Sequence, residues 1–470
     1  MSSFYIENFG CRATQAEGAA IEREFLNQGL ERARTRGNAQ FVVLNTCAVT
    51  AAAEQDARAC IRRIRRENPG CEVIVTGCYA QRAPREIAAL PGVSKVIGNS
   101  HKHNLAQIAL GTRSEMDSSK VGSFVPVHDL TRRDAFEDSI FVSDIFAHTE
   151  LLAAPVFDSA NERTRPNLKV QDGCNNRCSF CIIPSVRGRS RSLALEEVLR
   201  QVNQLVAADY REVVISGINL GRWGRDLRVT GESSSFEQLV RAILDHTSLQ
   251  KLRISSVEPM DWNDALISLM TDSPRIAKHA HVPMQSGSDA VLRRMHRKYR
   301  PWHYREKIEK LRSAMPSAAI GADVMVGFPG ETDAEFEETR RMVEDLPFTY
   351  LHVFTFSSRP GTPAATLPNQ IPVRIARERN RILREIAAEK KLAFMRSFVG
   401  LEVAAITLNV VSENSDCTWT EALTDNYLKL KLQGRHDANQ WVRARVLDRA
   451  DGQLVGDLQS TFYSRKVASN

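Results

Sequence analysis

Three cysteines on one short segment, Cys174, Cys178 and Cys181, have a spacing that suits an iron–sulfur cluster. They follow an apolar run, Leu168 to Val170, so we expect them on a loop at the end of a strand. Each thiolate can bind one iron of a cubane, which leaves the fourth iron open to a small molecule. A zinc knuckle or unrelated core thiols are the alternatives, and the aromatic Phe180 and the preceding strand argue against both.

This spacing, C-x3-C-x-aromatic-C, resembles the signature of the radical S-adenosylmethionine superfamily. The resemblance implies that the amino and carboxylate groups of S-adenosylmethionine chelate the open iron of a 4Fe-4S cluster. It also implies that one electron from this cluster cleaves the cofactor and yields a 5′-deoxyadenosyl radical, which can take hydrogen from an unactivated C–H bond.

Three further cysteines, Cys11, Cys47 and Cys78, each follow a strand-like run in the amino-terminal part of the chain. The carboxyl ends of parallel strands share one edge of a sheet, so we expect these thiols to converge and to hold a second cluster. Cys60 and Cys71 are an internal control, because the pattern places one within a helix and the other before its strand. The alternative is three core thiols at strand ends by chance, since free cysteine is common in protein cores.

Polar and glycine residues near the ends of the central strands are candidates for binding the cofactor. Glycine lets the backbone approach a ligand, and side chains such as Glu258 or Gln285 can bind ribose or amino-acid groups. A turn or a cap is the alternative for each single residue. The candidates are Phe180, Gly217, Asn219, Glu258, Gln285, Ser286, Asp323 and Gly327.

A loop after the three-cysteine segment carries Arg187, Arg189 and Arg191. Guanidinium groups bind phosphate or carboxylate through paired hydrogen bonds, so these residues are candidates for holding the substrate. The alternative is solvent-facing charge, or pairing with Glu196 and Glu197.

The pattern of apolar runs predicts three parts and an α/β fold class. Strands that alternate with helices over 1–112 predict an amino-terminal parallel α/β domain that holds the second, auxiliary cluster. Six strand–helix repeats over 164–398 predict a partial (β/α)6 barrel with its active site at the carboxyl ends of the strands. Alternation over 399–467 predicts a small antiparallel β-barrel, and 113–163 is predicted to be a partly ordered connector.

The predicted carboxyl-terminal barrel is a candidate RNA-binding module. Such barrels often bind RNA through one strand face and its loops. The candidate contacts are Tyr427, Lys429, Lys431, Arg443 and Arg445. A purely structural β module fits the same pattern.

Composition and charge fit a globular protein with an anionic partner. The 470 residues are 43% hydrophobic, which allows about two to four domains with sizeable cores. Lysine and arginine number 63 against 56 acidic residues, and the net charge of +7 favours a partner such as nucleic acid. No apolar run approaches the roughly 18 residues of a membrane span, and the first residues do not resemble a signal peptide. We therefore expect a cytoplasmic protein without membrane association, whose thiols stay reduced.

Taken together, the three parts resemble the methylthiotransferase family over nearly the full length of the chain. The motifs that carry the resemblance are Gly10-Cys11, Asn45-Thr46-Cys47, Gly77-Cys78, the loop from Cys174 to Cys181, Arg187-Gly188, Pro283-Met284-Gln285-Ser286-Gly287 and Gly327-Phe328-Pro329-Gly330-Glu331. The family implies an auxiliary 4Fe-4S cluster in the first domain, a radical S-adenosylmethionine barrel and a terminal TRAM domain. Thr14, Ala16 and Ser185 replace residues that are usual in the family, which affects the surroundings of the clusters but none of the cysteines.

Residues 45–50 and 181–191 resemble the branch that acts on N6-threonylcarbamoyladenosine at position 37, in the anticodon loop of tRNA. The resemblance implies that one S-adenosylmethionine methylates sulfur at the auxiliary cluster and that a second gives the radical that removes hydrogen from adenine C2. No ordinary base can deprotonate this strong aromatic C–H bond, which is why a radical is required. An electron donor such as flavodoxin or ferredoxin is also implied, whereas no particular oligomeric state is.

Other functions fit parts of the pattern. A methylthiotransferase for isopentenyladenosine-37 shares the cysteines, as does one for an aspartate of a ribosomal protein, although the latter should have a less basic terminal module. A non-catalytic iron–sulfur protein that carries electrons or binds RNA is the third alternative. The three-ligand site argues against it, because electron carriers usually ligate every iron.

Overall fold

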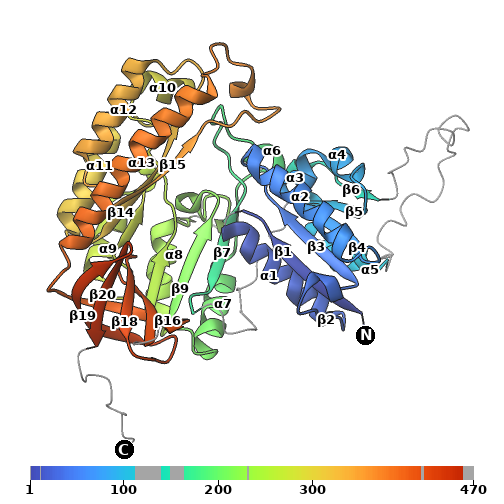
Figure 1. Cartoon of the computed structure of the whole chain (residues 1–470), viewed down its shortest axis with the longest axis horizontal. Helices are drawn as coiled ribbons and strands as arrows, with labels where there is room; N and C mark the ends of the chain where they lie inside the picture. Colours follow the sequence, from blue (N-terminus) through green and yellow to red (C-terminus); the bar gives the residue numbers. More distant parts are fainter. Residues whose placement is uncertain are drawn as a thin grey trace, which may run out of the picture.

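The chain folds into an α/β domain, a partial barrel and a closed β-barrel, in that order (Figure 1). The computed structural model describes residues 2–10, 12–111, 139–148, 164–229, 232–413 and 418–458. The α/β fold class and the three-part architecture that we expected from the sequence are confirmed. In the described part of the chain, no helix is both long and apolar enough to cross a membrane.

The amino-terminal sheet has six parallel strands in the order β2-β1-β3-β4-β5-β6. The three strands that the sequence predicted are β1 (Ser3–Asn8), β3 (Phe41–Thr46) and β4 (Glu72–Gly77). The sequence did not predict β2 (Glu31–Arg32), β5 (Val93–Gly98) and β6 (Ile140–Phe141). The helices of this domain are α1 (Arg12–Asn27), α2 (Ala51–Glu67), α3 (Cys78–Arg82), α4 (Pro84–Ala88) and α5 (Leu105–Leu110), with the 3-10 helix η2 (Asn99–Asn104) before α5.

Strand β6 comes from the segment that we expected to be a connector. It pairs in parallel with β5, and its Phe141 packs against the apolar core of the sheet. The described residues 139–142 of that segment therefore extend the amino-terminal sheet.

Six parallel strands form the partial barrel, as the sequence predicted. They are β7 (Asn167–Asp172), β9 (Glu212–Gly217), β12 (Lys251–Ile254), β13 (His279–His281), β14 (Ala319–Val326) and β15 (Tyr350–Thr355). The sheet β12-β9-β7-β8 and the sheet β13-β14-β15 join through a bridge between Leu252 and Ile276. Short β8 (Arg191–Ser192) runs antiparallel to β7 at the edge of the first sheet, and β10 (Arg228–Val229) and β11 (Glu232–Ser233) form a separate hairpin.

Helices pack on the outside of these strands and bury their apolar faces. Along β7, Leu168 and Val170 belong to the core shared with the helices, so Lys169 and Gln171 point to the opposite, inner face. These helices are α7 (Leu195–Ala207), α8 (Phe236–His246), α9 (Asp264–Asp272), α10 (Asp289–Arg294), α11 (Pro301–Ala314), α12 (Asp333–Asp345) and α13 (Val373–Arg396). The short helix α6 (Ile183–Arg187) packs instead against the core of the amino-terminal domain.

Helix α13 connects the partial barrel to the closed barrel (Figure 1). Its Leu383 is buried in the core of the partial barrel, and its Met395 is buried in the core of the closed barrel. The closed barrel has the order β16-β17-β18-β20-β19. Its strands are β16 (Glu402–Glu413), β17 (Thr418–Thr424), β18 (Lys429–Gln433), β19 (Trp441–Ala450) and β20 (Gln453–Leu458).

A turn of the closed barrel docks against the partial barrel. Arg253 is fully buried, donates to Glu212 Oε1 at 2.6 Å, and reaches the backbone oxygen of Asp425 at 3.1 Å. Its guanidinium lies 5.3 Å from the ring of Tyr427, which in turn lies 4.7 Å from the ring of His279. Tyr427 therefore contacts the partial barrel, and its predicted role as an RNA contact is not supported.

We expect the Arg253–Glu212 pair to make the stability of the chain sensitive to acid. Burial acts to raise the pKa of Glu212, but Arg253 and Arg165 outweigh burial and hold it below the ordinary 4.5. The pair stabilises the fold above about pH 4.5, and this contribution is lost as the pH falls through the lower folded pKa. Glu212→Gln should lower the free energy of unfolding at neutral pH by about 3 kcal/mol and weaken its dependence on acid. Denaturation curves at several pH values check this, and parallel pH profiles of the two proteins would contradict it.

Candidate functional site

The three-cysteine loop is held by backbone contacts to several segments. Gly173 begins it with φ +68°, and a Cβ there would lie 2.0 Å from a backbone oxygen of the arginine loop, so only glycine fits. Cys174 N donates to Gly188 O at 3.1 Å, and Ser179 N donates to Met295 O at 3.1 Å. These backbone contacts position the loop.

Two polar side chains, one from the segment after β9 and one from the segment after α10, contact the cysteine sulfurs. Asn219 Nδ2 lies 3.5 Å from Cys174 Sγ, and Arg297 Nη1 lies 3.2 Å from Cys178 Sγ. Burial, together with the charges of Cys178 and Cys174, raises the pKa of Cys181 to about 12. A thiolate can form at such a position when a bound metal supplies the compensating positive charge.

The three-cysteine loop would bind a cluster in a different way from a single metal ion. Among the described residues, no three His, Cys, Asp or Glu side chains are placed to hold one metal ion. A cubane takes each thiolate on a different iron, so its ligands lie further apart than those of one ion.

Two of the three amino-terminal cysteines lie at the ends of neighbouring strands. Thr46 of β3 pairs with Gly77 of β4, so the next residues, Cys47 and Cys78, leave the sheet side by side at its carboxyl edge, and both are buried. Cys11 falls outside the described residues. Gly10 lies so close that a Cβ on it would be 3.0 Å from Cys47 Sγ.

The same edge contacts the segment that follows the three-cysteine loop. Asn99 Nδ2 lies 3.6 Å from Cys78 Sγ and donates to Val186 O at 2.7 Å. Ile182 and Val186 share one apolar core with Cys78. The control cysteine Cys60 lies within α2, where its Sγ is 3.3 Å from a carboxylate oxygen of Glu7.

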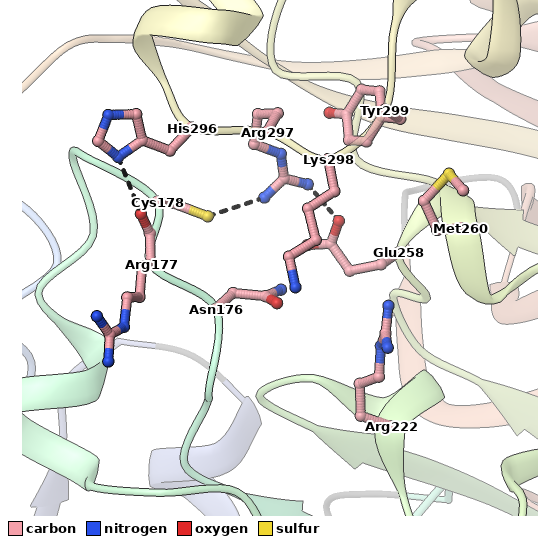
Figure 2. A pocket seen from close by; sticks show the side chains of 10 residues that line it. All are labelled: Asn176, Arg177, Cys178, Arg222, Glu258, Met260, His296, Arg297, Lys298 and Tyr299. Carbon is pink, nitrogen blue, oxygen red and sulfur yellow. Dashed lines mark hydrogen bonds and ion pairs between the residues drawn. The ribbon is translucent and has the colours of Figure 1, made fainter.

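A positively charged hollow opens beside Cys178 (Figure 2). Arg297 lies at its centre and bonds both to Cys178 Sγ and to the carboxylate of Glu258, while its guanidinium stacks 4.9 Å from the ring of Tyr299. The lining residues are Asn176, Arg177, Cys178, Arg222, Glu258, Met260, His296, Arg297, Lys298 and Tyr299. The hollow therefore suits an anionic group, such as the carboxylate of an amino acid, next to the cysteine loop.

Sequence reasoning missed Arg297. It follows α10 rather than a strand, and no spacing or periodicity marks it. Only the fold brings it to Cys178, which is 119 positions away.

Three buried polar atoms near the strand ends have no hydrogen-bond partner within the described residues. They are Ser216 Oγ, Asn219 Oδ1 and Gln285 Oε1. Gln285 also has φ +63°, an unusual conformation that two backbone hydrogen bonds to β14 stabilise. Buried polar atoms are nearly always paired, so these three atoms are candidates for hydrogen bonds to a polar ligand.

Comparisons with known proteins agree with this geometry. Residues 168–343 match the family model described as Radical SAM superfamily, and residues 3–98 match the one described as Uncharacterized protein family UPF0004. The chain is 35% identical over 462 residues to threonylcarbamoyladenosine tRNA methylthiotransferase MtaB of Bacillus subtilis, with 97% of each protein covered. The chain belongs to the radical S-adenosylmethionine tRNA methylthiotransferases.

Other relatives of this methylthiotransferase extend the comparison. MtaB of Aquifex aeolicus is 34% identical over 442 residues, which cover 94% of this chain and 99% of that protein. The tRNA-2-methylthio-N(6)-dimethylallyladenosine synthase of Methylacidiphilum infernorum is 29% identical over 479 residues, with 100% and 96% covered. Among solved structures, the radical S-adenosylmethionine methyltransferase TsrM of Kitasatospora setae has a TM-score of 0.52 at 14% identity, covering 78% of this chain and 75% of that one. This last likeness shows the fold alone.

Several predicted cofactor residues of the methylthiotransferase make packing or turn contacts. Ser286 Oγ lies 3.1 Å from Thr339 Oγ1, and Gly327 has φ +73° beside the side chain of Ala376. Phe180 packs edge-on against Phe328 with 6.5 Å between the ring centroids. These contacts are those of structural residues, and a role in cofactor binding stays a prediction for them.

Two other predicted cofactor residues lie within strands of the partial barrel. The backbone of Gly217 lies against Gln171, where a Cβ would be 2.9 Å from Gln171 Oε1. Asp323 has a side chain 28% exposed, and its Oδ1 lies 3.3 Å from Nε2 of buried His281. Asp323 is thus available to a ligand in the barrel, whereas Gly217 permits the close approach of two strands.

The three arginines of the following loop have different surroundings. Arg187 is buried and donates to Glu17 at 2.5 Å and to Asp172 at 2.9 Å, which favours a structural role over the predicted substrate contact. Arg191 donates to two backbone oxygens at 3.0 Å. Arg189 is exposed and keeps its predicted role as a substrate contact.

Substitution of two of these arginines should separate the structural role from the binding role. Arg187→Met leaves two buried carboxylates short of a partner, so the free energy of unfolding should fall by about 3–5 kcal/mol. Arg189→Gln changes an exposed side chain, so the free energy of unfolding should change by less than about 0.5 kcal/mol, while the KM for tRNA should rise. Denaturation curves and tRNA titrations measure the two effects, and equal loss of stability in both variants would contradict this distinction.

Proposed function

We propose that this methylthiotransferase attaches a methylthio group to adenine C2 of N6-threonylcarbamoyladenosine at position 37, in the anticodon loop of tRNA. The observation that carries the proposal is the contact between the two cysteine regions, in which Asn99 bridges Cys78 and the segment after Cys181. The choice of base is supported by relatives named for threonylcarbamoyladenosine, which are 33–35% identical to this chain. Relatives named for dimethylallyladenosine are 29–30% identical.

The residues of the site fit two 4Fe-4S clusters and S-adenosylmethionine. When bound, these groups would supply the radical that takes hydrogen from C2, the sulfur and the methyl group. Cys174, Cys178 and Cys181 would hold the cluster that binds S-adenosylmethionine, whereas Cys11, Cys47 and Cys78 would hold the auxiliary one.

The chain's own polar groups would orient the cofactor and the substrate. Arg297 places a positive charge next to Cys178, where it can hold a carboxylate. Asn219 and Gln285 offer buried acceptors to amino or hydroxyl groups. The walls of the barrel would keep water from the reacting atoms.

The closed barrel and the hollow near Cys178 suit macromolecular partners. Lys429, Arg443 and Arg445 are exposed on the outer faces of β18 and β19, where they can bind the phosphates of tRNA. Bases in RNA loops can be unstacked and presented to an active site, as this reaction requires. Exposed Arg177, beside Cys178, suits an acidic electron donor such as flavodoxin or ferredoxin. With these two partners, the enzyme would act in the cytoplasm.

Nucleoside mass spectrometry of tRNA from a deletion strain tests the proposal. We expect the methylthio form of N6-threonylcarbamoyladenosine to disappear and its precursor to accumulate, and the wild-type gene to restore the modification. Loss of the methylthio group from isopentenyladenosine instead would assign the other tRNA branch. An unchanged tRNA profile would contradict both assignments.

A further inference from the structure

Five charged side chains form a buried network between the amino-terminal domain and the partial barrel, which we call the Glu17 network. Its members are Glu17 of α1, Lys102 of η2, Lys169 and Asp172 of β7, and Arg187 of α6. Glu17 is the central residue, because its carboxylate lies 2.7 Å from Lys102 Nζ, 2.9 Å from Lys169 Nζ and 2.5 Å from Arg187 Nη1. Lys169 and Arg187 bind Asp172 as well, at 3.1 and 2.9 Å.

The Glu17 network reaches the backbone beside both cysteine regions. On one side, Lys102 Nζ donates at 3.1 Å to Asn45 Oδ1, two residues before Cys47. On the other side, Asp172 accepts at 2.8 Å from the backbone N–H of Gly173, the residue before Cys174. A continuous series of hydrogen bonds therefore joins the two strand ends from which the two cluster sites start.

The charges in this network are almost fully removed from water. The side chains of Glu17, Lys102, Lys169 and Arg187 are at most 4% exposed. Burial acts to raise the pKa of Glu17, but Arg187, Lys102 and Lys169 outweigh it and hold the pKa well below its ordinary range, so Glu17 stays ionised.

Buried ion pairs are a poor way to gain stability, because the cost of removing charges from water offsets most of their attraction. Apolar side chains of similar size would join two domains at least as firmly. What directional, charged contacts add is a fixed orientation, and orientation matters most where two sites must cooperate.

We infer that the Glu17 network holds the two cluster sites at a fixed distance and orientation. Glu17 is thus a positioning residue for transfer of the methylthio group. The inference rests on the proposed function, in which a group prepared at one site reacts with a substrate radical generated at the other. Such a transfer depends on the distance between the sites, and a misplacement of about 1 Å can cost on the order of 100-fold in rate. Cleavage of S-adenosylmethionine involves one site only and does not depend on that distance.

The test compares Glu17→Gln with the wild type as full-length, cluster-loaded enzymes. The substitution keeps the volume of the side chain and removes only its charge. We expect 5′-deoxyadenosine to form close to the wild-type rate, while the methylthiolated nucleoside formed per 5′-deoxyadenosine falls about 10- to 100-fold. Pulsed dipolar spectroscopy of the two reduced clusters should show a broader distance distribution, and Glu17→Asp, which keeps the charge, should restore part of both signals.

A matched control removes a different buried carboxylate. Glu212 is equally buried and bonds to Arg253, but it lies at the other end of the barrel strands, so Glu212→Gln should lose stability and keep both the product ratio and the distance distribution. An unchanged ratio and distribution in Glu17→Gln would overturn the inference, as would an equal fall of the ratio in Glu212→Gln.

Two further outcomes are distinguishable. If Glu17→Gln fails to take up its clusters, Lys102→Met carries the same test, because it breaks the network on the Asn45 side.

If the wild type cleaves S-adenosylmethionine but methylthiolates no tRNA, the proposed function fails. The distance between the clusters then still tests the inference, and a distribution in the variant that is no broader than in the wild type would overturn it.

Discussion

Cys174→Ala is expected to abolish cleavage of S-adenosylmethionine, whereas Cys47→Ala should retain cleavage and lose transfer of the methylthio group. Cys174 belongs to the loop whose three thiols would hold a cluster with one iron open to the cofactor, so its loss would remove the site of electron transfer. Cys47 lies at the carboxyl edge of the other sheet and, in the proposed function, would contribute to the auxiliary site only. Assays of 5′-deoxyadenosine and of methylthiolated nucleoside in the same reaction separate the two activities.

Cys60→Ala is the matched control for this pair. Cys60 is also a buried thiol of the amino-terminal domain, but it lies within α2, so both activities should stay near the wild-type level. Equal loss of cleavage in Cys174→Ala and Cys47→Ala would contradict the assignment of separate roles to the two cysteine sets.

Arg297→Met is expected to lower kcat/KM for S-adenosylmethionine by about 100- to 1,000-fold. The substitution removes the positive charge beside Cys178 Sγ and leaves the carboxylate of Glu258 without its partner. The loss of a neighbouring cation should also make the cluster harder to reduce, because the net charge around a cluster sets its potential. Steady-state kinetics and a redox titration of the purified protein measure the two effects.

Arg293→Met supplies the control for this substitution. Arg293 lies on α10 just before Arg297 in the chain, but its side chain is 63% exposed and pairs with Asp289 on the surface. We expect kinetics and potential close to those of the wild type. A potential unchanged in Arg297→Met, or lowered equally in both variants, would contradict the role given to Arg297.

The strand ends that carry the cysteines could be predicted because the chemistry there follows a local pattern. An apolar run followed by a polar residue and a cysteine marks the end of β3 and β4 as clearly as the C-x3-C-x2-C spacing marks the loop after β7. The two-residue strands β2 and β6 could not be predicted, because period-two alternation needs a longer segment.

The partners of individual charges could not be predicted either. The local sequence suggested Glu196 and Glu197 as acceptors for the arginine loop, whereas Arg187 binds Glu17, 170 positions away. No sequence pattern marked Arg297 as a functional residue, because its position beside Cys178 is created by the turn that follows α10. Pairing between charges that are distant in the sequence depends on how the domains dock, and this docking cannot be predicted from a single sequence.

The docking of the closed barrel also bears on which RNAs the enzyme accepts. Glu212 and His279, which adjoin its turn, are the first residues of β9 and β13, while the cysteine loop leaves the carboxyl end of β7. At about 3.3 Å per residue, an eight-residue strand such as β14 spans roughly 26 Å. An RNA bound to the basic strands β18 and β19 has to extend over that length before the base at position 37 reaches the cysteine loop of the partial barrel. Short oligonucleotides should therefore react far more slowly than intact tRNA at equal concentration, so that substrate choice depends on the reach of the folded nucleic acid as well as on its base.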